Sequence, residues 1–200
     1  MAQQAGFEAV FVSGSALAYA GLARPDVSLL TSQDVAHAVE RVAERISLPV
    51  LADADSGYGN AINLQRTVRM LERAGAAAIQ IEDQIDKKTP ASLTTRPLVS
   101  VGEMVAKIKA AQDARANDQT MISARSDAAI TVGLDEALRR VDAYLAAGAD
   151  MVFAEGLADI DSMKRLLASV GGRAPVLHNV LEGGRSAVDD AATLEGLGYA

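Results

Sequence analysis

Two carboxylates, Asp53 and Asp55, stand one residue apart after the apolar run 48–52, and a glycine-rich turn separates them from a helical pattern that begins at Ala61. In an extended strand, residues i and i+2 point to the same side, so both carboxylates can converge beyond the strand's carboxyl end. Two like charges held so close need a cation, a proton or another positive group between them. The alternative is that one aspartate caps the next helix and the other lies in a solvated turn.

Further polar residues close the apolar runs that follow in the chain. They are Glu82, Arg125, Glu155 and Asn179. Together with Asp26, the carboxylates Asp53, Asp55 and Glu82 form a set of oxygen donors that suits Mg²⁺, which takes hard ligands and keeps several waters. Arg125 can hold a substrate carboxylate through two parallel hydrogen bonds. The alternative for Arg125 is an internal salt bridge with Glu82 or Asp55.

Alternating strands and helices must position these residues. Residues 1–6 are expected to end a helix at Gly6, and a loop through Arg24-Pro25-Asp26 is expected after Ser13-Gly14-Ser15. Capping boxes are predicted at Thr31 to Asp34 and at Ser100 to Glu103. Strands are predicted at 8–12, 49–53, 77–81, 120–124, 150–154 and 175–177. Helices are predicted at 31–46, 62–74, 100–115, 134–147, 161–169 and 187–197.

This alternation predicts an α/β fold with a parallel sheet covered by helices, either doubly wound and open or closed as a (β/α)₈ barrel. The regular series of charged strand ends favours the TIM-type barrel, because there all strand ends surround one mouth. Six strand-helix units are fewer than eight. We therefore expect one incomplete barrel domain over residues 1–200, a fragment or an abbreviated version in which the first strand and the last unit are missing.

Composition excludes several classes of protein. Half of the 200 residues are hydrophobic, enough for one substantial core. Lys and Arg number 19 against 26 Asp and Glu, a net charge of −7, which argues against nucleic acid or anionic membranes as partners. The chain has no cysteine, so disulfides, thiolate metal sites and cysteine nucleophiles are excluded. No apolar run reaches the roughly 18 residues of a membrane span, and no signal peptide precedes the first strand, so a cytoplasmic location is expected.

Seven motifs follow one another along nearly the whole chain. They are Val-Ser-Gly-Ser at 12–15, Arg-Pro-Asp at 24–26, Asp-Ala-Asp-Ser-Gly-Tyr-Gly-Asn at 53–60, Ile-Glu-Asp-Gln at 81–84, Ser-Ala-Arg-Ser-Asp-Ala at 123–128, Ala-Gly-Ala-Asp-Met-Val-Phe-Ala-Glu-Gly at 147–156 and Asn-Val-Leu-Glu-Gly-Gly at 179–184. In this order they resemble the motifs of the isocitrate lyase and phosphoenolpyruvate mutase superfamily.

The resemblance implies an α/β barrel that uses Mg²⁺, or Mn²⁺ in its place, to break or rearrange C–C or P–C bonds of small 2-hydroxy or 2-oxo acids through an enolate-like intermediate. It implies catalytic roles for Glu82 and Arg125, and a homotetramer. By the same resemblance, Asp53, Asp55, Glu82 and Asp26 are the metal ligands. The substrate-binding residues it implies are Ser13, Gly14, Ser15, Arg125, Glu155 and Asn179.

The loop at 85–97 departs from the family pattern. C–C lyases of the family carry Lys-Arg-Cys-Gly-His there, and Pro90 stands where the cysteine would be. Lys88-Thr89 resembles the Lys-Thr-Asn of the P–C branch. Lys88 is the predicted catalytic residue of this loop, and Ser92 is a weaker alternative because an alcohol is a poor acid near neutral pH.

Three hypotheses follow. The first is a Mg²⁺-dependent lyase that cleaves a C–C bond of a small 2-oxo or 2-hydroxy dicarboxylic acid through a metal-bound enolate, similar to an oxaloacetate decarboxylase or a methylisocitrate lyase. The second keeps the site and moves the chemistry to a P–C bond, as in phosphonopyruvate hydrolase or phosphoenolpyruvate mutase. The third is a barrel remnant without catalysis, because an incomplete barrel leaves unpaired strand edges.

Overall fold

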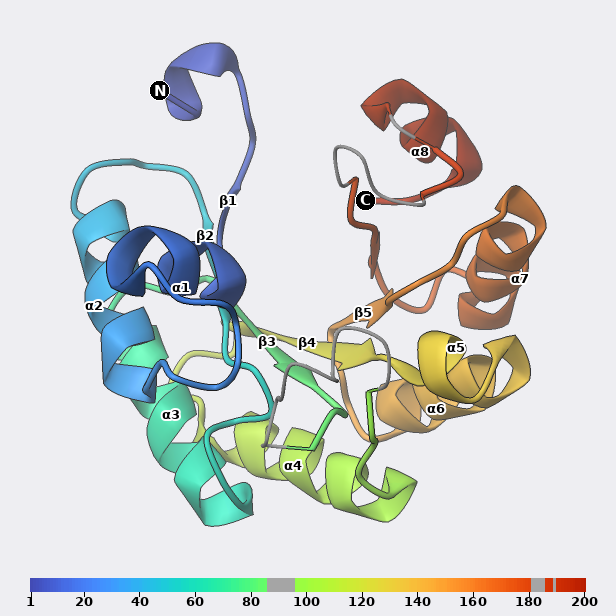
Figure 1. Cartoon of the computed structure of the whole chain (residues 1–200), viewed down its shortest axis with the longest axis horizontal. Coiled ribbons are helices and arrows are strands. Elements are labelled where there is room, and N and C mark those ends of the chain that lie inside the picture. Colours follow the sequence, from blue (N-terminus) through green and yellow to red (C-terminus); the bar gives the residue numbers. More distant parts are fainter. Residues whose placement is uncertain (86–95, 181–185, 189) are drawn as a thin grey trace.

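The computed structural model describes residues 1–85, 96–180, 186–188 and 190–200 (Figure 1). The strands are β1 (Val10–Val12), β2 (Val50–Asp53), β3 (Ala78–Glu82), β4 (Met121–Ser126), β5 (Met151–Ala154) and β6 (Val176–Leu177). The helices are α1 (Gly14–Leu22), α2 (Ser32–Ala43), α3 (Ala61–Arg73), α4 (Val101–Ala114), α5 (Ala128–Thr131), α6 (Leu134–Ala146), α7 (Ile160–Val170) and α8 (Ala191–Leu197). A short 3₁₀ helix, Gln3–Ala5, precedes β1.

The six strands form one parallel sheet in the order β1-β2-β3-β4-β5-β6. This order follows the chain and has no switch point, which distinguishes a barrel from a doubly wound sheet. Figure 1 shows the sheet curled, with the helices around its outside and the two ends of the chain on either side of the open part of the curl. The prediction of an incomplete TIM-type barrel is confirmed.

Local signals placed most helix starts correctly. Thr31 and Asp34 form the predicted reciprocal capping box, with Thr31 N donating to Asp34 Oδ2 at 2.8 Å and Asp34 N to Thr31 Oγ1 at 3.3 Å. Ser100 Oγ accepts from Glu103 N at 3.1 Å, which is one half of the second predicted box. Gly6 ends the opening 3₁₀ helix with a φ of 85°, where glycine is favoured.

The largest error of the prediction lies after β1, where a helix replaces the expected loop. Ser13 caps α1, and its Oγ accepts from Ala16 N at 3.4 Å. The segment Ala16 to Leu22 is apolar on all sides, so it lacks the periodicity that reveals a surface helix. The short helix α5 was also not predicted, and α8 begins at Ala191, later than predicted, because Asp190 caps it.

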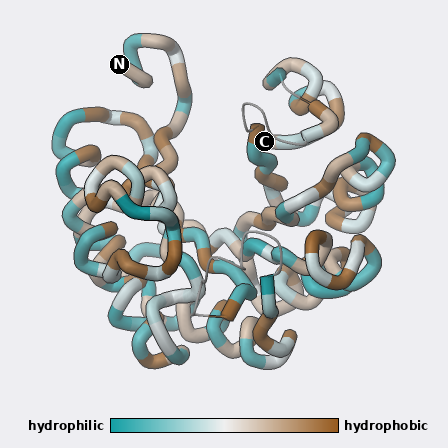
Figure 2. The backbone as a smooth tube through the Cα atoms, in the orientation of Figure 1, coloured by the Kyte–Doolittle hydropathy of each residue, from teal (hydrophilic) through white to brown (hydrophobic). Residues whose placement is uncertain are grey.

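The core lies between the sheet and the helices that cover it. Figure 2 shows hydrophobic and hydrophilic residues alternating along the helices, the pattern of elements with one buried face. Val35 and Val39 of α2 are fully buried in this core. Other fully buried side chains of this core are Leu64, Leu71, Ile79, Ile81, Met104, Ile108, Ile122, Met163 and Leu166.

A buried polar cluster around Asp83 joins the ends of β3 and β4 to α6. Asp83 Oδ2 accepts hydrogen bonds from Ser126 Oγ at 2.8 Å, Tyr144 OH at 2.7 Å and Arg140 Nη1 at 3.0 Å. Asp83 Oδ1 accepts from Asp127 N at 2.9 Å. Burial and the charge of Asp83 raise the pKa of Tyr144, so the phenol keeps the proton that it donates. A fully buried carboxylate is stable only with such partners.

Replacing Tyr144 by Phe removes one of these donors and leaves the buried Asp83 carboxylate short of a partner. We expect the free energy of unfolding to fall by about 1–3 kcal/mol, measured by urea denaturation. Tyr19→Phe, at an exposed position of α1, is the matched control and should change it by less than about 0.5 kcal/mol. Equal stability of the two variants would contradict this account of the cluster.

Glu136 supports the same cluster through Arg140, whose Nε donates to Glu136 Oε1 at 2.8 Å. Hydrogen bonds from Arg139 and then Arg140 lower the pKa of Glu136 from 4.5 to about 2. A depressed carboxyl pKa stabilises the fold above the unfolded value and loses this effect as pH falls through the folded one. The stability advantage of the wild type over Glu136→Gln should therefore be constant above about pH 5 and shrink between about pH 4.5 and 2, as followed by urea midpoints.

Candidate active site

The carboxylates of Asp53 and Asp55 both lie close to Gly14, at the carboxyl ends of β1 and β2. Gly14 N donates to Asp53 Oδ2 at 3.1 Å, and Asp55 N donates to Asp53 Oδ1 at 3.2 Å. A Cβ atom on Gly14 would lie 3.4 Å from Asp53 Oδ2 and 3.8 Å from Asp55 Oδ1. Both carboxylates thus face one small region, as predicted, but the cause differs from the period of two of a strand, because Asp55 lies in the turn after β2 with a φ of 46°.

Neither aspartate caps the helix that follows. Asn60 caps α3, and its Oδ1 accepts from Ile62 N at 3.0 Å and from Asn63 N at 3.1 Å. The capping alternative for the two aspartates is therefore wrong. Their position is set by the end of β2 and by the tight turn of residues 54–57, in which Gly57 N donates to Ala54 O at 2.8 Å.

Arg125 lies at the centre of a second group of site residues, at the ends of β3 to β6. Its Nε lies 3.5 Å from Glu82 Oε2 and its Nη2 lies 3.1 Å from Glu155 Oε2. Glu155 Oε2 also accepts from Asn179 Nδ2 at 3.3 Å. The guanidinium stands over the ring of Phe153, 5.2 Å from its centroid. Three predicted substrate residues and one predicted metal ligand are thus in contact.

Asp127, which sequence reasoning missed, fixes the orientation of Arg125. Its two carboxylate oxygens accept from Arg125 Nε at 3.1 Å and from Arg125 Nη2 at 2.9 Å. Asp127 also forms an ion pair with Arg96. The i, i+2 spacing of Arg125 and Asp127 at a strand end is the same signal that identified Asp53 and Asp55, and it could have revealed this pair.

The electrostatics of this group favour a permanent ion pair. Burial opposes charge on Arg125, but the carboxylates of Asp127, Glu82 and Glu155 outweigh it and raise its pKa. Burial likewise opposes the charge of Asp127, and Arg125 and Arg96 outweigh it, so its pKa is lowered. Among the described residues, the hydrogen bonds of Arg125 with Asp127 use Nε and Nη2 and not Nη1. This nitrogen can donate to the carboxylate of a ligand.

Tyr58 is a buried phenol within electrostatic reach of Asp26 and of the aspartate pair. Burial raises its pKa, and the charges of Asp55, Asp53 and Asp26 raise it further. The phenol therefore stays protonated. Its φ of 60° is left-handed, an uncommon conformation for a tyrosine that recurs at functional sites. Sequence reasoning did not select this residue.

The donor chemistry at the aspartate pair fits Mg²⁺. Carboxylate oxygens are its preferred protein ligands, and one or two carboxylates with several waters are its usual environment. No group of three or more Asp, Glu or His side chains among the described residues is arranged to hold a metal ion. The convergent pair Asp53 and Asp55 carries the fit, and Glu82 and Asp26 as further ligands stay predictions.

The remaining predicted residues divide into two sets. The Oγ atoms of Ser13 and Ser15 lie 2.9 Å apart at the start of α1, and Gly14, which lies between them in the sequence, donates its N–H to Asp53. Lys88, and with it Pro90 and Ser92, falls outside the described residues, so its catalytic role stays a prediction.

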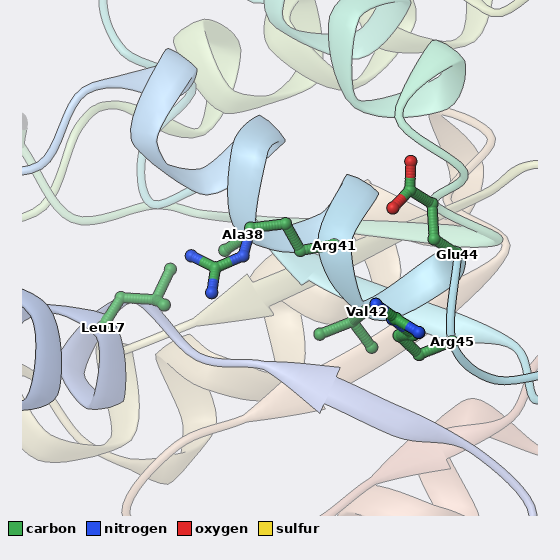
Figure 3. Close-up of a pocket in the computed structure, with 6 residues that line it drawn as sticks. All are labelled: Leu17, Ala38, Arg41, Val42, Glu44 and Arg45. Atoms are coloured by element: carbon green, nitrogen blue, oxygen red, sulfur yellow. The ribbon is translucent and has the colours of Figure 1, made fainter.

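Two of the cavities lined by described residues lie toward opposite ends of α2. One of about 390 Å³ adjoins the site, with Asp55, Ser56 and Tyr58 on one side and Thr31 and Ser32 on the other. The other, of about 640 Å³, is open and lies between α1 and the end of α2, where Arg41 extends from α2 toward Leu17 (Figure 3). None of the predicted site residues lines the second cavity, whose walls are Leu17, Ala38, Arg41, Val42, Glu44 and Arg45.

The chain is similar to known proteins over almost its whole length. The phosphoenolpyruvate phosphomutase family model matches residues 1–199. The chain belongs to the isocitrate lyase and phosphoenolpyruvate mutase superfamily. Within this superfamily it is 46% identical to 2,3-dimethylmalate lyase of Eubacterium barkeri, over 97% of this chain and 66% of the relative. It is 40% identical to 2-methylisocitrate lyase of Shewanella oneidensis, over 93% of this chain and 63% of the relative. The chain thus spans less than two thirds of the length of these superfamily relatives.

Solved structures of the superfamily superimpose on almost the whole chain. A crystal structure of 2,3-dimethylmalate lyase matches with a TM-score of 0.93 and 33% identity, covering 99% of this chain and 66% of that one. Oxaloacetate acetylhydrolase in complex with 3,3-difluorooxalacetate matches with a TM-score of 0.93 and 28% identity, covering 99% and 68%. Phosphonopyruvate hydrolase with oxalate and Mg²⁺ matches with a TM-score of 0.78 and 36% identity, covering 88% and 60%.

Replacing Asp127 by Asn removes the charge that balances Arg125 and Arg96 in a buried position. We expect the free energy of unfolding to fall by up to about 3–5 kcal/mol, measured by urea denaturation. Asp135→Asn, which breaks an exposed pair with Arg165, is the matched control and should cost no more than about 1 kcal/mol. A similar loss in the two variants would mean that Asp127 contributes no more than a surface charge.

Proposed function

We propose that this chain carries the metal-binding and carboxylate-binding residues of a Mg²⁺-dependent lyase that cleaves a C–C bond of a small 2-hydroxy or 2-oxo dicarboxylic acid. One observation supports this most directly. The convergent carboxylates of Asp53 and Asp55 and the oriented guanidinium of Arg125 stand at the same end of the sheet. A cation site and an anion site at one mouth suit a substrate that is itself an anion and gains further negative charge during bond cleavage.

The chain's own residues account for substrate binding. Arg125 offers Nη1 to a substrate carboxylate, while Asp127 and Glu155 hold its other nitrogens. The hydroxyls of Ser13 and Ser15 offer donors for a second carboxylate beside Asp53. A divalent cation held by the aspartate pair would supply positive charge where negative charge develops on the substrate.

A more specific part of the proposal is which bond of the substrate is cleaved, a C–C or a P–C bond. The relatives named 2,3-dimethylmalate lyase and 2-methylisocitrate lyase match this chain over 93% of its length or more, which supports C–C cleavage. Structures of phosphonopyruvate hydrolase and phosphoenolpyruvate phosphomutase match at 36–37% identity over 88% of it, so a P–C bond is the second candidate. Lys88 is proposed as the catalytic residue of the loop after Asp83. The homotetramer stays a prediction that sedimentation of the full chain can check.

No helix in the described residues combines the length and apolarity that a membrane crossing needs. The proposed partners are small carboxylate anions, and the net charge of −7 makes nucleic acid an unsuitable partner.

Activity of the full chain should be assayed on oxaloacetate, 2-methylisocitrate, 2,3-dimethylmalate and phosphonopyruvate, with Mg²⁺ and with a chelator. We expect Mg²⁺-dependent cleavage of a dicarboxylate. Asp53→Ala should lower kcat/KM at least about 100-fold in a chain that still folds, whereas Asp118→Ala, in an exposed loop, should leave kcat/KM unchanged.

The outcomes separate the candidates. Formation of phosphate or phosphoenolpyruvate from phosphonopyruvate would mean that the enzyme acts on a P–C bond and would reject the proposed C–C cleavage. Full activity in the chelator or in Asp53→Ala would reject the role of the aspartate pair. A folded chain that acts on none of the four substrates would favour the barrel remnant without catalysis.

A further inference from the structure

Lys107 is a buried lysine whose charged end reaches the turn of the aspartate pair. It lies on α4, and its side chain is 2% exposed. Its Nζ donates to Ser56 O at 2.9 Å and lies 3.8 Å from Glu103 Oε1, on a glutamate side chain that is 53% exposed. Lysine is almost never fully buried without a partner for its charge. The short contact of this ammonium is therefore with the backbone of the candidate active site.

The turn that Lys107 contacts is strained and closely packed. Asp55 has a φ of 46°, in the left-handed region that non-glycine residues rarely adopt. Buried side chains donate hydrogen bonds to the next two backbone carbonyls. Lys107 donates to Ser56 O, and Thr67 Oγ1 donates to Gly57 O at 3.3 Å. Two helices, α4 and α3, thus supply the donors that hold the peptide groups directly after Asp55.

We propose that Lys107 is a positioning residue for the aspartate pair. By binding Ser56 O, its ammonium keeps Asp55 in the left-handed conformation in which its carboxylate faces the same region as that of Asp53. This preorganises the pair for a divalent cation. The inference rests on the proposed function, because it assumes that the pair binds such a cation.

Two effects of Lys107 on cation binding have opposite signs, which makes the proposal testable. As a positive charge near the pair, Lys107 repels a cation, so removing it would tighten binding. As the donor that fixes the turn, Lys107 favours binding, so removing it would weaken binding. A lysine that only filled the core would lower stability and leave the cation affinity unchanged. The proposal states that the second effect is the larger.

The test uses Mn²⁺ alone as the probe, titrated into the full chain and followed by the electron paramagnetic resonance signal of free Mn²⁺. Lys107→Met keeps the length of the side chain and removes the donor and the charge. We expect its dissociation constant for Mn²⁺ to be about tenfold higher than that of the wild type, as expected for the loss of one charged hydrogen bond. Hydrogen exchange of the Gly57 amide, which closes the turn, should become faster.

Controls separate this effect from general damage. Glu103→Gln removes the exposed partner of Lys107 and should leave Mn²⁺ affinity and Gly57 exchange at wild-type values. Lys107→Arg keeps charge and donors and should restore affinity to within about threefold of the wild type. If Lys107→Met does not fold, Lys107→Gln takes its place, with the same loss expected because Gln is shorter and uncharged.

Each result has one meaning. Wild-type or tighter Mn²⁺ binding in Lys107→Met, with unchanged Gly57 exchange, would overturn the positioning role alone. Absence of Mn²⁺ binding in the wild type would overturn the metal site of the proposed function and, with it, this inference. Weaker binding in Lys107→Met with recovery in Lys107→Arg would support both.

Discussion

Parallel pairing of the strands in chain order is the constraint on which the structure depends. It places every strand's carboxyl end at one edge of the curled sheet, so residues far apart in the sequence become neighbours. The same constraint gathers carboxylates, because Asp53, Glu82 and Glu155 all stand at or just after strand ends. Such a cluster is stable only where cations or fixed donors offset the repulsion. Many of the residues around the cluster supply such cations and donors.

Three buried or nearly buried cationic side chains offset this repulsion between carboxylates, and each comes from a different helix or strand. Arg125 comes from the sheet itself and contacts Glu82, Glu155 and Asp127. Arg140 comes from α6 and binds Asp83, directly after Glu82. Lys107 comes from α4 and binds the turn after Asp55. Each cation is held by its helix or strand before any ligand arrives, so little reorganisation is left for binding.

The sequence predicted the parts of this arrangement that depend on short spacing. The convergence of Asp53 and Asp55 was expected from their i, i+2 spacing and the capping box at Thr31 from a local pattern of residue types, while the strand order was expected from the polar residues that recur at the strand ends. Contacts that cross between elements could not be predicted in this way. Nothing in the spacing of Lys107 and Ser56, 51 residues apart, indicates that they touch. Helix α1 was missed because its apolar surface lacks a helical period.

Gly14 and Gly57 show two different reasons for a glycine at this site. Gly57 has a φ of 99° and packs against Leu64, so its backbone conformation requires glycine. Gly14 has no such requirement, since it is the first residue of α1, and a Cβ there would meet Asp53 at an ordinary contact distance. What a methyl group would take up is the space between the start of α1 and the two carboxylates. Gly14 therefore leaves both carboxylates accessible from the side of α1, and a larger residue there would narrow this access without changing the backbone.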